Sequence, residues 1–245
     1  MTPREPFEPG AASELVQAVV TADGEDAVLK IQDPHRESEH EAAALELWAG
    51  EGAIRLLAHD PEEHALLLER CFPGTPLSER TTEASMDVLV GLLPRLWKRP
   101  DGFRSIEDDV PFLRTDIEGA RDERLKDAAL SYLRELVPSQ GERVLVNQDL
   151  HGENVLAAQR EPWLVIDPKP LAAERELSAA SIVRSDELGH RRRDVLYRLD
   201  RLCSDLGLDR ERAIGWTVLH TVAWSGGDDV VGPHLEAVHW LLEAA

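Results

Sequence analysis

The chain has 245 residues and a formal net charge of −20 at pH 7, a length that can bury a substantial core in one large domain or two lobes. This acidity argues against a nucleic-acid partner, because phosphates require a basic surface, whereas it permits a small cationic ligand. No apolar run could cross a bilayer, no signal peptide is recognisable, and Cys71 and Cys203 are far apart in the sequence, so we expect a cytoplasmic protein with no membrane partner and two buried free thiols.

Two β-rich runs near the N-terminus predict a hairpin. Residues 15–20 and 27–31 are joined through a segment that contains Asp23-Gly24, a strong signal for a tight turn between strands. The second run reads Ala-Val-Leu-Lys and matches the kinase strand whose lysine, here Lys30, holds the α and β phosphates of ATP. A surface lysine that closes a hairpin is the commoner structural explanation for such a residue.

A helix is predicted over residues 38–48, which are rich in helix formers and end before Gly50. An apolar stripe at helical spacing is formed by Ala44, Leu47 and Trp48. Glu41 lies one turn before this stripe, so we expect it to face inward and pair with Lys30. Glu37 is the competing partner for Lys30, and the alternative role of Glu41 is a solvated helix charge.

The character of the chain changes after residue 70. Residues up to about 69 are strand-rich, and the Pro/Gly cluster at 72–76 indicates a boundary. We therefore divide the chain into a β-rich part, residues 1–70, and a helical part, residues 71–245. Periodicity and capping signals predict helices over residues 82–97, 117–136, 177–188, 191–206, 209–224 and 233–244.

The segment 147–154 reads Asn-Gln-Asp-Leu-His-Gly-Glu-Asn and is followed thirteen residues later by a further aspartate. Asp149, Asn154 and Asp167 match the base, the metal-binding Asn and the metal-binding Asp of the kinase catalytic set. Short strands predicted over residues 143–146, 155–157 and 163–166 put Asn154 and Asp167 at the open ends of one hairpin. Their amide and carboxylate oxygens would then converge on a hard cation such as Mg²⁺. The Asp and Asn spacing alone would be weak evidence, because loops rich in these residues are common.

These motifs together resemble the aminoglycoside phosphotransferase superfamily, and more narrowly its streptomycin 6-phosphotransferase and hydroxyurea phosphotransferase branch. The narrower likeness rests on Asp167-Pro168-Lys169-Pro170 in place of Asp-Phe-Gly, and on Glu174-Arg175-Glu176. The resemblance covers the chain from about residue 15 onward. It implies an α+β, two-lobed protein-kinase-like fold, with a small, shortened β-rich N-lobe and a larger helical C-lobe. It also implies ATP and Mg²⁺ as cofactors and the phosphorylation of a hydroxyl on a small molecule.

The resemblance further implies a role for each candidate residue. Lys30, held by Glu41, would grip the nucleotide phosphates. Asn154 and Asp167 would hold Mg²⁺. Asp149 would orient the acceptor hydroxyl and accept its proton.

Other candidates surround this set. The nucleotide would also meet a loop around residues 9–13 that includes Ser13, and a hinge at Glu69 and Cys71. Acidic side chains that follow Asp167 are candidates for meeting guanidinium or ammonium groups of the acceptor, although a solvated charge is the commoner role: Glu174, Glu176, Asp186 and Glu187.

Two departures from the superfamily pattern leave the function open among three alternatives. Asn147 stands where the superfamily usually has His, so we expect a perturbed catalytic loop rather than an inactive one. The N-terminal segment is shorter than usual, so we expect an incomplete phosphate-covering loop and a lower affinity for ATP. The acceptor would be an aminoglycoside such as streptomycin, or instead a hydroxyurea-like or metabolic compound. The third alternative is a nucleotide-binding pseudokinase, which the retention of both metal ligands and the base disfavours.

Overall fold

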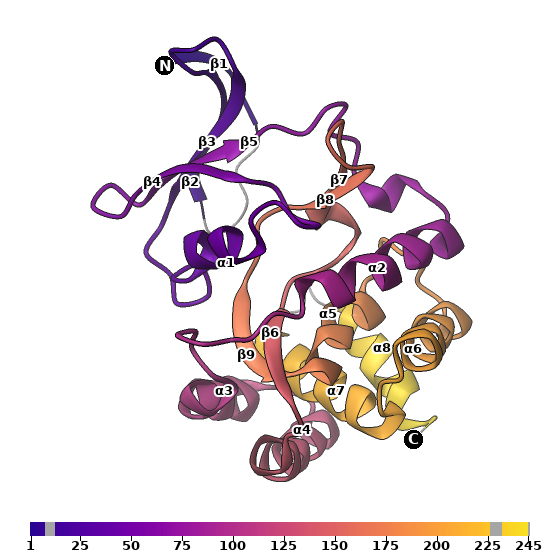
Figure 1. Ribbon diagram of the computed structural model, residues 1–245. Coiled ribbons are helices and arrows are strands. Elements are labelled where there is room, and N and C mark those ends of the chain that lie inside the picture. The colour runs from indigo at the N-terminus through magenta and orange to yellow at the C-terminus, as the bar shows by residue number, and fades with distance from the viewer. Residues whose placement is uncertain (8–12, 226–231, 245) are drawn as a thin grey trace. The chain divides into compact units, whose positions relative to one another are not determined.

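The computed structural model describes residues 1–7, 13–225 and 232–244, which fold into two compact units (Figure 1). The first unit comprises Met1–Leu77 and Asn154–Pro170, and the second comprises Ser78–Glu153 and Leu171–Ala245. The chain therefore enters the second unit after Leu77, returns to the first for a short insertion, and ends in the second.

The first unit is built on a five-stranded antiparallel sheet with the strand order β1-β2-β3-β5-β4. The strands are β1 (Thr2–Pro6), β2 (Ser13–Val20), β3 (Asp26–Gln32), β4 (Leu56–Asp60) and β5 (Ala65–Glu69). β2 and β3 form the predicted hairpin, and Gly24 takes a φ of 87° in its turn, a conformation that glycine adopts without steric cost. On β3, Lys30 lies between Val16 of β2 and Leu66 of β5.

Helix α1 (Glu41–Trp48) follows the β2–β3 hairpin and buries the carboxylate of Glu41 on its apolar face. The buried residues are Glu41, Ala44, Leu45 and Trp48, which follow the i, i+3, i+4, i+7 spacing of one helix face. The predicted stripe was wrong at Leu47, which is 41% exposed, because Leu45 occupies the inner position instead. The helix begins at Glu41 rather than at residue 38, and its C-cap is Ala49, which takes a left-handed φ of 50°.

The insertion in the first unit is a short hairpin of β7 (Val155–Ala157) and β8 (Trp163–Val165), as predicted. Backbone hydrogen bonds tie it on both sides: Ala157 N–H donates to the Thr75 carbonyl at 2.9 Å, and Ile54 N–H donates to the Val165 carbonyl at 3.0 Å. These bonds explain why the hairpin belongs to the first unit although it lies far along the chain.

The second unit is mostly helical. Its helices are α2 (Thr82–Leu96), α3 (Ile106–Gly119), α4 (Glu123–Leu136), α5 (Ala179–Arg184), α6 (Arg192–Leu206), α7 (Arg210–Ser225) and α8 (Gly232–Leu242). A two-stranded sheet joins β6 (Arg143–Asn147) to β9 (Pro170–Glu174). Single 3₁₀ turns lie at Leu77–Glu79, Val137–Ser139, Gly152–Asn154 and Arg175–Ser178. Helix α7 is buried along almost its whole length and contacts α3, α4, α5, α6 and α8, which makes it the centre of the core.

Two predicted helices were wrong in extent. The single helix over 117–136 is the end of α3 and the whole of α4, separated where the Asp122 carboxylate caps α4 by accepting from the N–H groups of Arg124 and Leu125. The helix over 177–188 is α helical only at Ala179–Arg184. Its predicted last turn is a loop because the guanidinium of Arg198 takes the carbonyls of Val183 and Ser185, which would otherwise accept helical bonds.

Candidate active site

A cavity of about 440 Å³ in the first unit is the candidate nucleotide site, and its volume falls in the range of small-ligand pockets. It is lined by β2, β3, α1, β5, the segment after β5 and the β7–β8 hairpin. Its lining residues are Phe7, Val16, Val28, Lys30, Glu41, Ile54, Leu68, Glu69, Arg70, Cys71, Phe72, Pro73, Gly74, Asn154, Leu156, Ile166 and Asp167. Most of the walls are apolar, and the charged lining residues are Lys30, Glu41, Glu69 and Asp167, which the sequence singled out, together with Arg70.

Lys30 is the central cation of this cavity. Its side chain is buried, and Nζ lies 2.7 Å from Glu41 Oε2 and also forms an ion pair with Asp167 Oδ1. The predicted Lys30–Glu41 pair is confirmed, while Glu37 lies instead 3.7 Å from the ammonium of Lys169. Burial alone would lower the pKa of Lys30, but the carboxylates of Glu41 and Asp167 outweigh it and raise that pKa.

Glu41 is a buried carboxylate in a site that contains two acids and one cation. Burial raises the pKa of Glu41 to about 7, against the opposing effect of the Lys30 cation. Its Oε2 accepts from Lys30 and from Gln32, whereas Oε1 has no hydrogen-bond partner among the residues that the structure describes. Such an arrangement costs free energy on burial, so its presence on a cavity wall makes Glu41 a candidate site residue.

Asn154 and Asp167 lie at the open ends of the β7–β8 hairpin, as predicted. Ile166 N–H donates to the Asn154 carbonyl at 2.9 Å, which holds the two ends together, and Asp167 takes a left-handed φ of 47°. The donor set of one amide and one carboxylate oxygen fits Mg²⁺, which binds through one or two carboxylates together with substrate phosphates. In the described part of the chain no cluster of three or more His, Cys, Asp or Glu is arranged to hold a metal by itself.

The carboxylate of Glu69 is already hydrogen-bonded within the protein. Its two carboxylate oxygens accept from the guanidinium of Arg160 at 2.8 and 2.9 Å, and Oε2 also accepts from Arg55 N–H at 2.9 Å. Burial favours a higher pKa for Glu69, but these donors outweigh it and lower that pKa. Any contact of Glu69 with a nucleotide would therefore come from its backbone.

Cys71 and Ser13 complete the candidate nucleotide residues. The Cys71 thiol is half-buried, and burial raises its pKa to about 11, so it is a neutral group on the cavity wall. Cys203 is likewise a free, half-buried thiol. Ser13 begins β2, opposite Gln32, while its side chain and residues 9–12 lie outside what the structure describes.

The candidate catalytic loop lies in the second unit, directly after β6. Asn147 ends this strand and is buried, and its Oδ1 accepts from the N–H of Asp149 at 3.1 Å. A side-chain bond to the backbone two residues on is the geometry that Asn uses to fix a turn. Asn147 therefore helps to fix the conformation of the loop that carries Asp149.

A His–Glu pair beside Asp149 was not predicted from the sequence. His151 Nδ1 lies 3.1 Å from Glu187 Oε1, and His151 Nε2 lies 3.8 Å from Asp149 Oδ1. Glu187 Oε1 also accepts from Gly152 N–H at 3.0 Å and from the Ser185 hydroxyl at 2.9 Å. Glu187 is 36 residues from His151, so no local motif could have joined them.

The other acidic candidates for acceptor binding differ in exposure. Glu174 is buried and forms an ion pair with Arg212 at 2.7 Å. Glu176 is also buried and accepts from Asp209 N–H at 3.3 Å. Asp186 is the one among these candidates whose carboxylate is largely open to solvent, with 45% of its side chain exposed.

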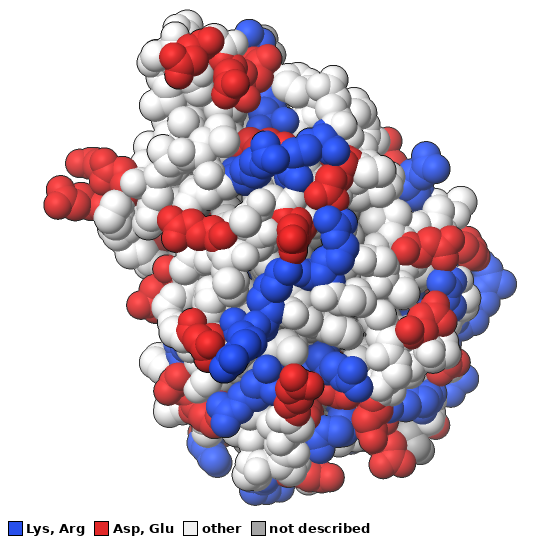
Figure 2. All heavy atoms as spheres, in the orientation of Figure 1, with Lys and Arg blue, Asp and Glu red and all other residues white. Residues whose placement is uncertain are grey.

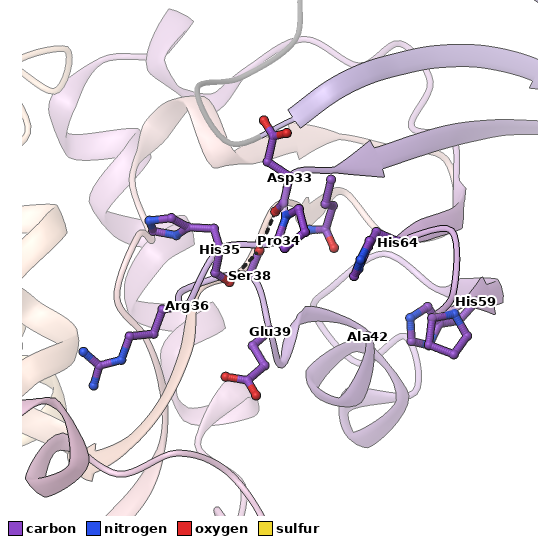
Figure 3. A pocket seen from close by; sticks show the side chains of 11 residues that line it. Asp33, Pro34, His35, Arg36, Ser38, Glu39, Ala42, His59 and His64 are labelled. Atoms are coloured by element: carbon purple, nitrogen blue, oxygen red, sulfur yellow. Dashed lines mark hydrogen bonds between the residues drawn. The ribbon is translucent and has the colours of Figure 1, made fainter.

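A second cavity of about 440 Å³ lies in the first unit along residues 33–39 and the β4–β5 hairpin (Figure 3). Histidine side chains from both segments, including His59 and His64, line it, and the Ser38 hydroxyl bonds back to the carbonyls of its own loop. None of the charged side chains that line it is buried, in contrast to Lys30 and Glu41 in the first cavity. The first cavity is therefore the better candidate for a ligand site.

The charge of the molecule is mixed on a local scale. Figure 2 shows that one face carries basic side chains beside acidic ones, although the net charge of the chain is −20.

In the part of the chain that the structure describes, no helix has the length and apolar character needed to cross a membrane.

Comparison with known proteins gives consistent matches over nearly the whole chain. Residues 2–228 match the family described as aminoglycoside/hydroxyurea antibiotic resistance kinase. A streptomycin 6-kinase from Streptomyces glaucescens is 42% identical over 233 residues, which are 88% of this chain and 75% of that protein. A hydroxyurea phosphotransferase from Kitasatospora aureofaciens is 39% identical over 232 residues, which are 89% of this chain and 67% of that protein.

Solved structures show the same fold at low sequence identity. A choline kinase from Streptococcus pneumoniae superposes with a TM-score of 0.74 at 16% identity, covering 99% of this chain and 95% of that chain. A spectinomycin phosphotransferase, solved with ADP and spectinomycin, gives a TM-score of 0.60 at 15% identity, covering 98% and 88%. The predicted α+β, two-lobed kinase-like fold is thereby confirmed. With 42% identity to a streptomycin 6-kinase and a family match over residues 2–228, the chain belongs to the aminoglycoside/hydroxyurea antibiotic resistance kinase family.

Proposed function

We propose that this protein is an ATP- and Mg²⁺-dependent phosphotransferase that transfers the γ-phosphoryl group to a hydroxyl of an aminoglycoside such as streptomycin. The observation that carries the proposal is the buried Lys30 cation between Glu41 and Asp167 on the wall of one cavity. A lysine held by a helix glutamate and placed beside a metal-binding aspartate is the arrangement by which kinases bind nucleotide phosphates.

Asn154 and Asp167 would hold the metal ion. The Lys30 pair uses Asp167 Oδ1, and Oδ2 accepts no hydrogen bond from any residue that the structure describes. When bound, Mg²⁺ would neutralise charge on the phosphate oxygens. Lys30 would bind the same phosphates, and the backbone near Glu69 and Cys71 would meet the adenine. The division of tasks that we propose follows the predicted lobes, residues 1–70 for the nucleotide and residues 71–245 for the catalytic loop, metal ligands and acceptor. The compact units differ from these lobes, because residues 71–77 and Asn154–Pro170, which carry both proposed metal ligands, belong to the first unit.

Asp149 would act on the acceptor. In the transfer, a bond forms between the acceptor oxygen and the γ-phosphorus, the bond from that phosphorus to the β,γ-bridging oxygen breaks, and ADP leaves. The hydroxyl proton passes to the Asp149 carboxylate. Because the transition state of such transfers is loose, orientation of the hydroxyl matters more than base strength.

The relatives favour two acceptors. The similarity to streptomycin 6-kinases, at 42% and 40% identity, supports an aminoglycoside, whose cationic groups also suit an acidic protein. The hydroxyurea phosphotransferase at 39% identity makes hydroxyurea the second candidate. We propose the cytoplasm as the compartment, because that is where ATP is available.

A turnover screen tests the proposal. Release of ADP would be followed with streptomycin, other aminoglycosides, hydroxyurea and inositol-type compounds, each with and without Mg²⁺. We expect Mg²⁺-dependent turnover with streptomycin above the rate without acceptor. Turnover with hydroxyurea alone would select the second candidate. ATP binding without turnover on any acceptor would select the nucleotide-binding pseudokinase and refute the transfer function.

A further inference from the structure

Three ionisable side chains in the second unit lie side by side at the catalytic loop and form the array Glu187–His151–Asp149. Glu187 lies on one side of the His151 ring and Asp149 on the other, at 3.1 Å from Nδ1 and 3.8 Å from Nε2. The side chains of the three are 21%, 26% and 19% exposed, so they are largely shielded from water and their charges interact strongly.

We propose that His151, fixed by Glu187, is a positioning residue that holds the Asp149 carboxylate for the phosphoryl transfer. This inference rests on the proposed function, because the task of Asp149 is defined by that reaction. His151 itself takes no proton from the acceptor. It acts through Asp149.

The loop that carries Glu187 is anchored by an interior cation. The side chain of Arg198 on α6 is fully buried, and its guanidinium donates to the carbonyls of Ser185, Leu188 and Gly189 at 2.7, 2.9 and 2.7 Å. The Thr82 hydroxyl donates to the Leu188 carbonyl at 2.9 Å. A loop held by this many bonds fixes the position of the Glu187 carboxylate, and so the orientation of the His151 ring.

Glu187 is also joined to the backbone of the catalytic loop. It accepts from Gly152 N–H, and a Cβ at Gly152 would meet Leu188 Cδ2 at 3.0 Å and Ser78 Cα at 3.1 Å. The loop and the 185–189 segment are therefore in close contact, which glycine at position 152 permits. One carboxylate thus sets both the loop backbone and the imidazole that faces Asp149.

The charge state of His151 decides whether it can hold Asp149. The groups that face it are Glu187, Asp149 and Arg184. Burial and Arg184 would lower the pKa of His151, but the two carboxylates outweigh them and raise it. The charged ring donates from both nitrogens, so Nδ1–H can bond Glu187 while Nε2–H faces Asp149. The neutral ring that keeps its Nδ1–H on Glu187 would turn a bare nitrogen lone pair toward the Asp149 carboxylate.

Kinetics of four variants test this role in the full-length protein with ATP, Mg²⁺ and streptomycin. His151→Gln should lower kcat about 10- to 100-fold, with the KM for ATP changed by less than about 3-fold, because misplacement of a reacting group affects the chemical step. His151→Lys keeps a cation and should retain more of kcat than His151→Gln. Glu187→Gln should lower kcat in the same direction. His190→Gln is the matched control, since His190 pairs with Glu236 at 2.8 Å in the same unit and should leave kcat unchanged.

The dependence of kcat on pH distinguishes a positioning role of His151 from a role in protein stability alone. In the unaltered protein kcat should fall as pH rises through the pKa of His151, because the ring loses the proton that faces Asp149. This alkaline limb should be absent in His151→Gln and shifted to higher pH in His151→Lys. A folded His151→Gln variant that keeps both its kcat and the alkaline limb would overturn the proposal.

A measurement that needs no turnover distinguishes failure of this inference from failure of the proposed function. Titration of His151 by NMR should give a pKa that falls in Asp149→Asn and also in Glu187→Gln. If no acceptor is phosphorylated but both shifts occur, the transfer function fails and the array stands as described. If the pKa of His151 does not respond to Asp149→Asn, the coupling between them is refuted whether or not the protein is active.

Discussion

Asp149 and Asp167 are both carboxylates, yet their surroundings suit them to different proposed tasks. Asp167 lines the cavity in the first unit and pairs with the buried ammonium of Lys30. Asp149 lies on the loop after β6. Its backbone N–H donates to Asn147 Oδ1, and its carboxylate lies beside His151. The first set of contacts suits phosphate and metal binding, and the second suits the orientation of an acceptor hydroxyl.

Substitution should separate these two tasks. Asp149→Asn should lower kcat by about 100- to 10,000-fold, the range for loss of a general base, while the Kd for ATP changes little. Asp167→Asn should instead remove the Mg²⁺-dependent part of ATP affinity, because it removes the one carboxylate of the proposed metal site. Isothermal titration calorimetry with a non-hydrolysable ATP analogue, with and without Mg²⁺, measures both. Equal loss of nucleotide affinity in the two variants would contradict this division.

The His151–Glu187 pair should make stability depend on pH in a defined window. Burial would raise the pKa of Glu187, but its bonds to His151 and Ser185 lower it to about 2, so its contribution is complete above about pH 4.5 and is lost as pH falls. The pKa of His151 is raised, so its contribution is complete below about pH 6.5 and is lost as pH rises through the raised value. The pair therefore stabilises most between about pH 4.5 and 6.5.

Urea unfolding of Glu187→Gln at several pH values tests this window. The variant should be less stable than the parent protein by about 2–3 kcal/mol near pH 5.5, and by less near pH 9. A deficit that is equal at the two pH values would show that the loss is one of packing or hydrogen bonding and not of the ion pair.

At the scale of elements, local patterns predicted most strands and helices, and contacts between distant residues decided some of the others. The β2–β3 and β7–β8 hairpins and α2, α6 and α7 follow from alternation, turn and capping signals in short windows. Strand β9 was not predicted, because all five of its residues are buried and its pairing partner is the distant β6. Helix α3 was recognised only in its last residues, although Ser105 and Asp108 form a capping box at its start.

The residues of the candidate site also fall into those that local motifs predict and those that only contacts between distant residues bring together. Lys30, Glu41, Asn154 and Asp167 belong to motifs a few residues long, and the sequence placed them in their strands, helix and hairpin ends. The bond between Arg160 and Glu69 joins residues 91 positions apart, and no local pattern relates them. Such pairs depend on how the chain folds back on itself, which periodicity does not report.

The contact between α4 and α7 offers a test of helix packing. Gly215 lies inside α7, where an added Cβ would come within 2.6 Å of Tyr132 Cδ1 on α4. Gly215→Ala should therefore destabilise the protein by about 1–3 kcal/mol, because overpacking exceeds the gain in helix propensity. Gly91→Ala is the matched control inside α2, where a Cβ would meet nothing within 4 Å, and it should stabilise by about 0.5–1 kcal/mol. Thermal unfolding of both variants measures the difference, and stabilisation by Gly215→Ala would refute close packing at this position.

At the scale of the whole molecule, the net charge of −20 favours cationic ligands over anionic ones. The face shown in Figure 2 nevertheless carries both positive and negative side chains, so long-range attraction of an acceptor to the protein must be measured separately from its binding at the site. Varying the salt concentration separates the two effects, because charges farther apart than the Debye length of about 10 Å at 0.1 M are screened.

Ionic strength should therefore affect the two candidate acceptors differently. The kcat/KM for streptomycin, which is cationic, should fall as salt rises from about 20 to about 200 mM, whereas the value for neutral hydroxyurea should change little. Steady-state kinetics at matched ATP and Mg²⁺ concentrations measures both. A parallel response of the two acceptors would show that the acidity of the molecule has no part in acceptor capture.

The measurement that tests the central claim most directly is mass spectrometry of streptomycin after incubation with the protein, ATP and Mg²⁺. We predict that streptomycin gains one phosphoryl group, that an equal amount of ADP is formed, and that Asp149→Asn forms neither product at a comparable rate. Unmodified streptomycin beside ATP that stays intact, with a folded protein and with hydroxyurea and the other acceptors equally unmodified, would contradict the assignment of this chain as a phosphotransferase.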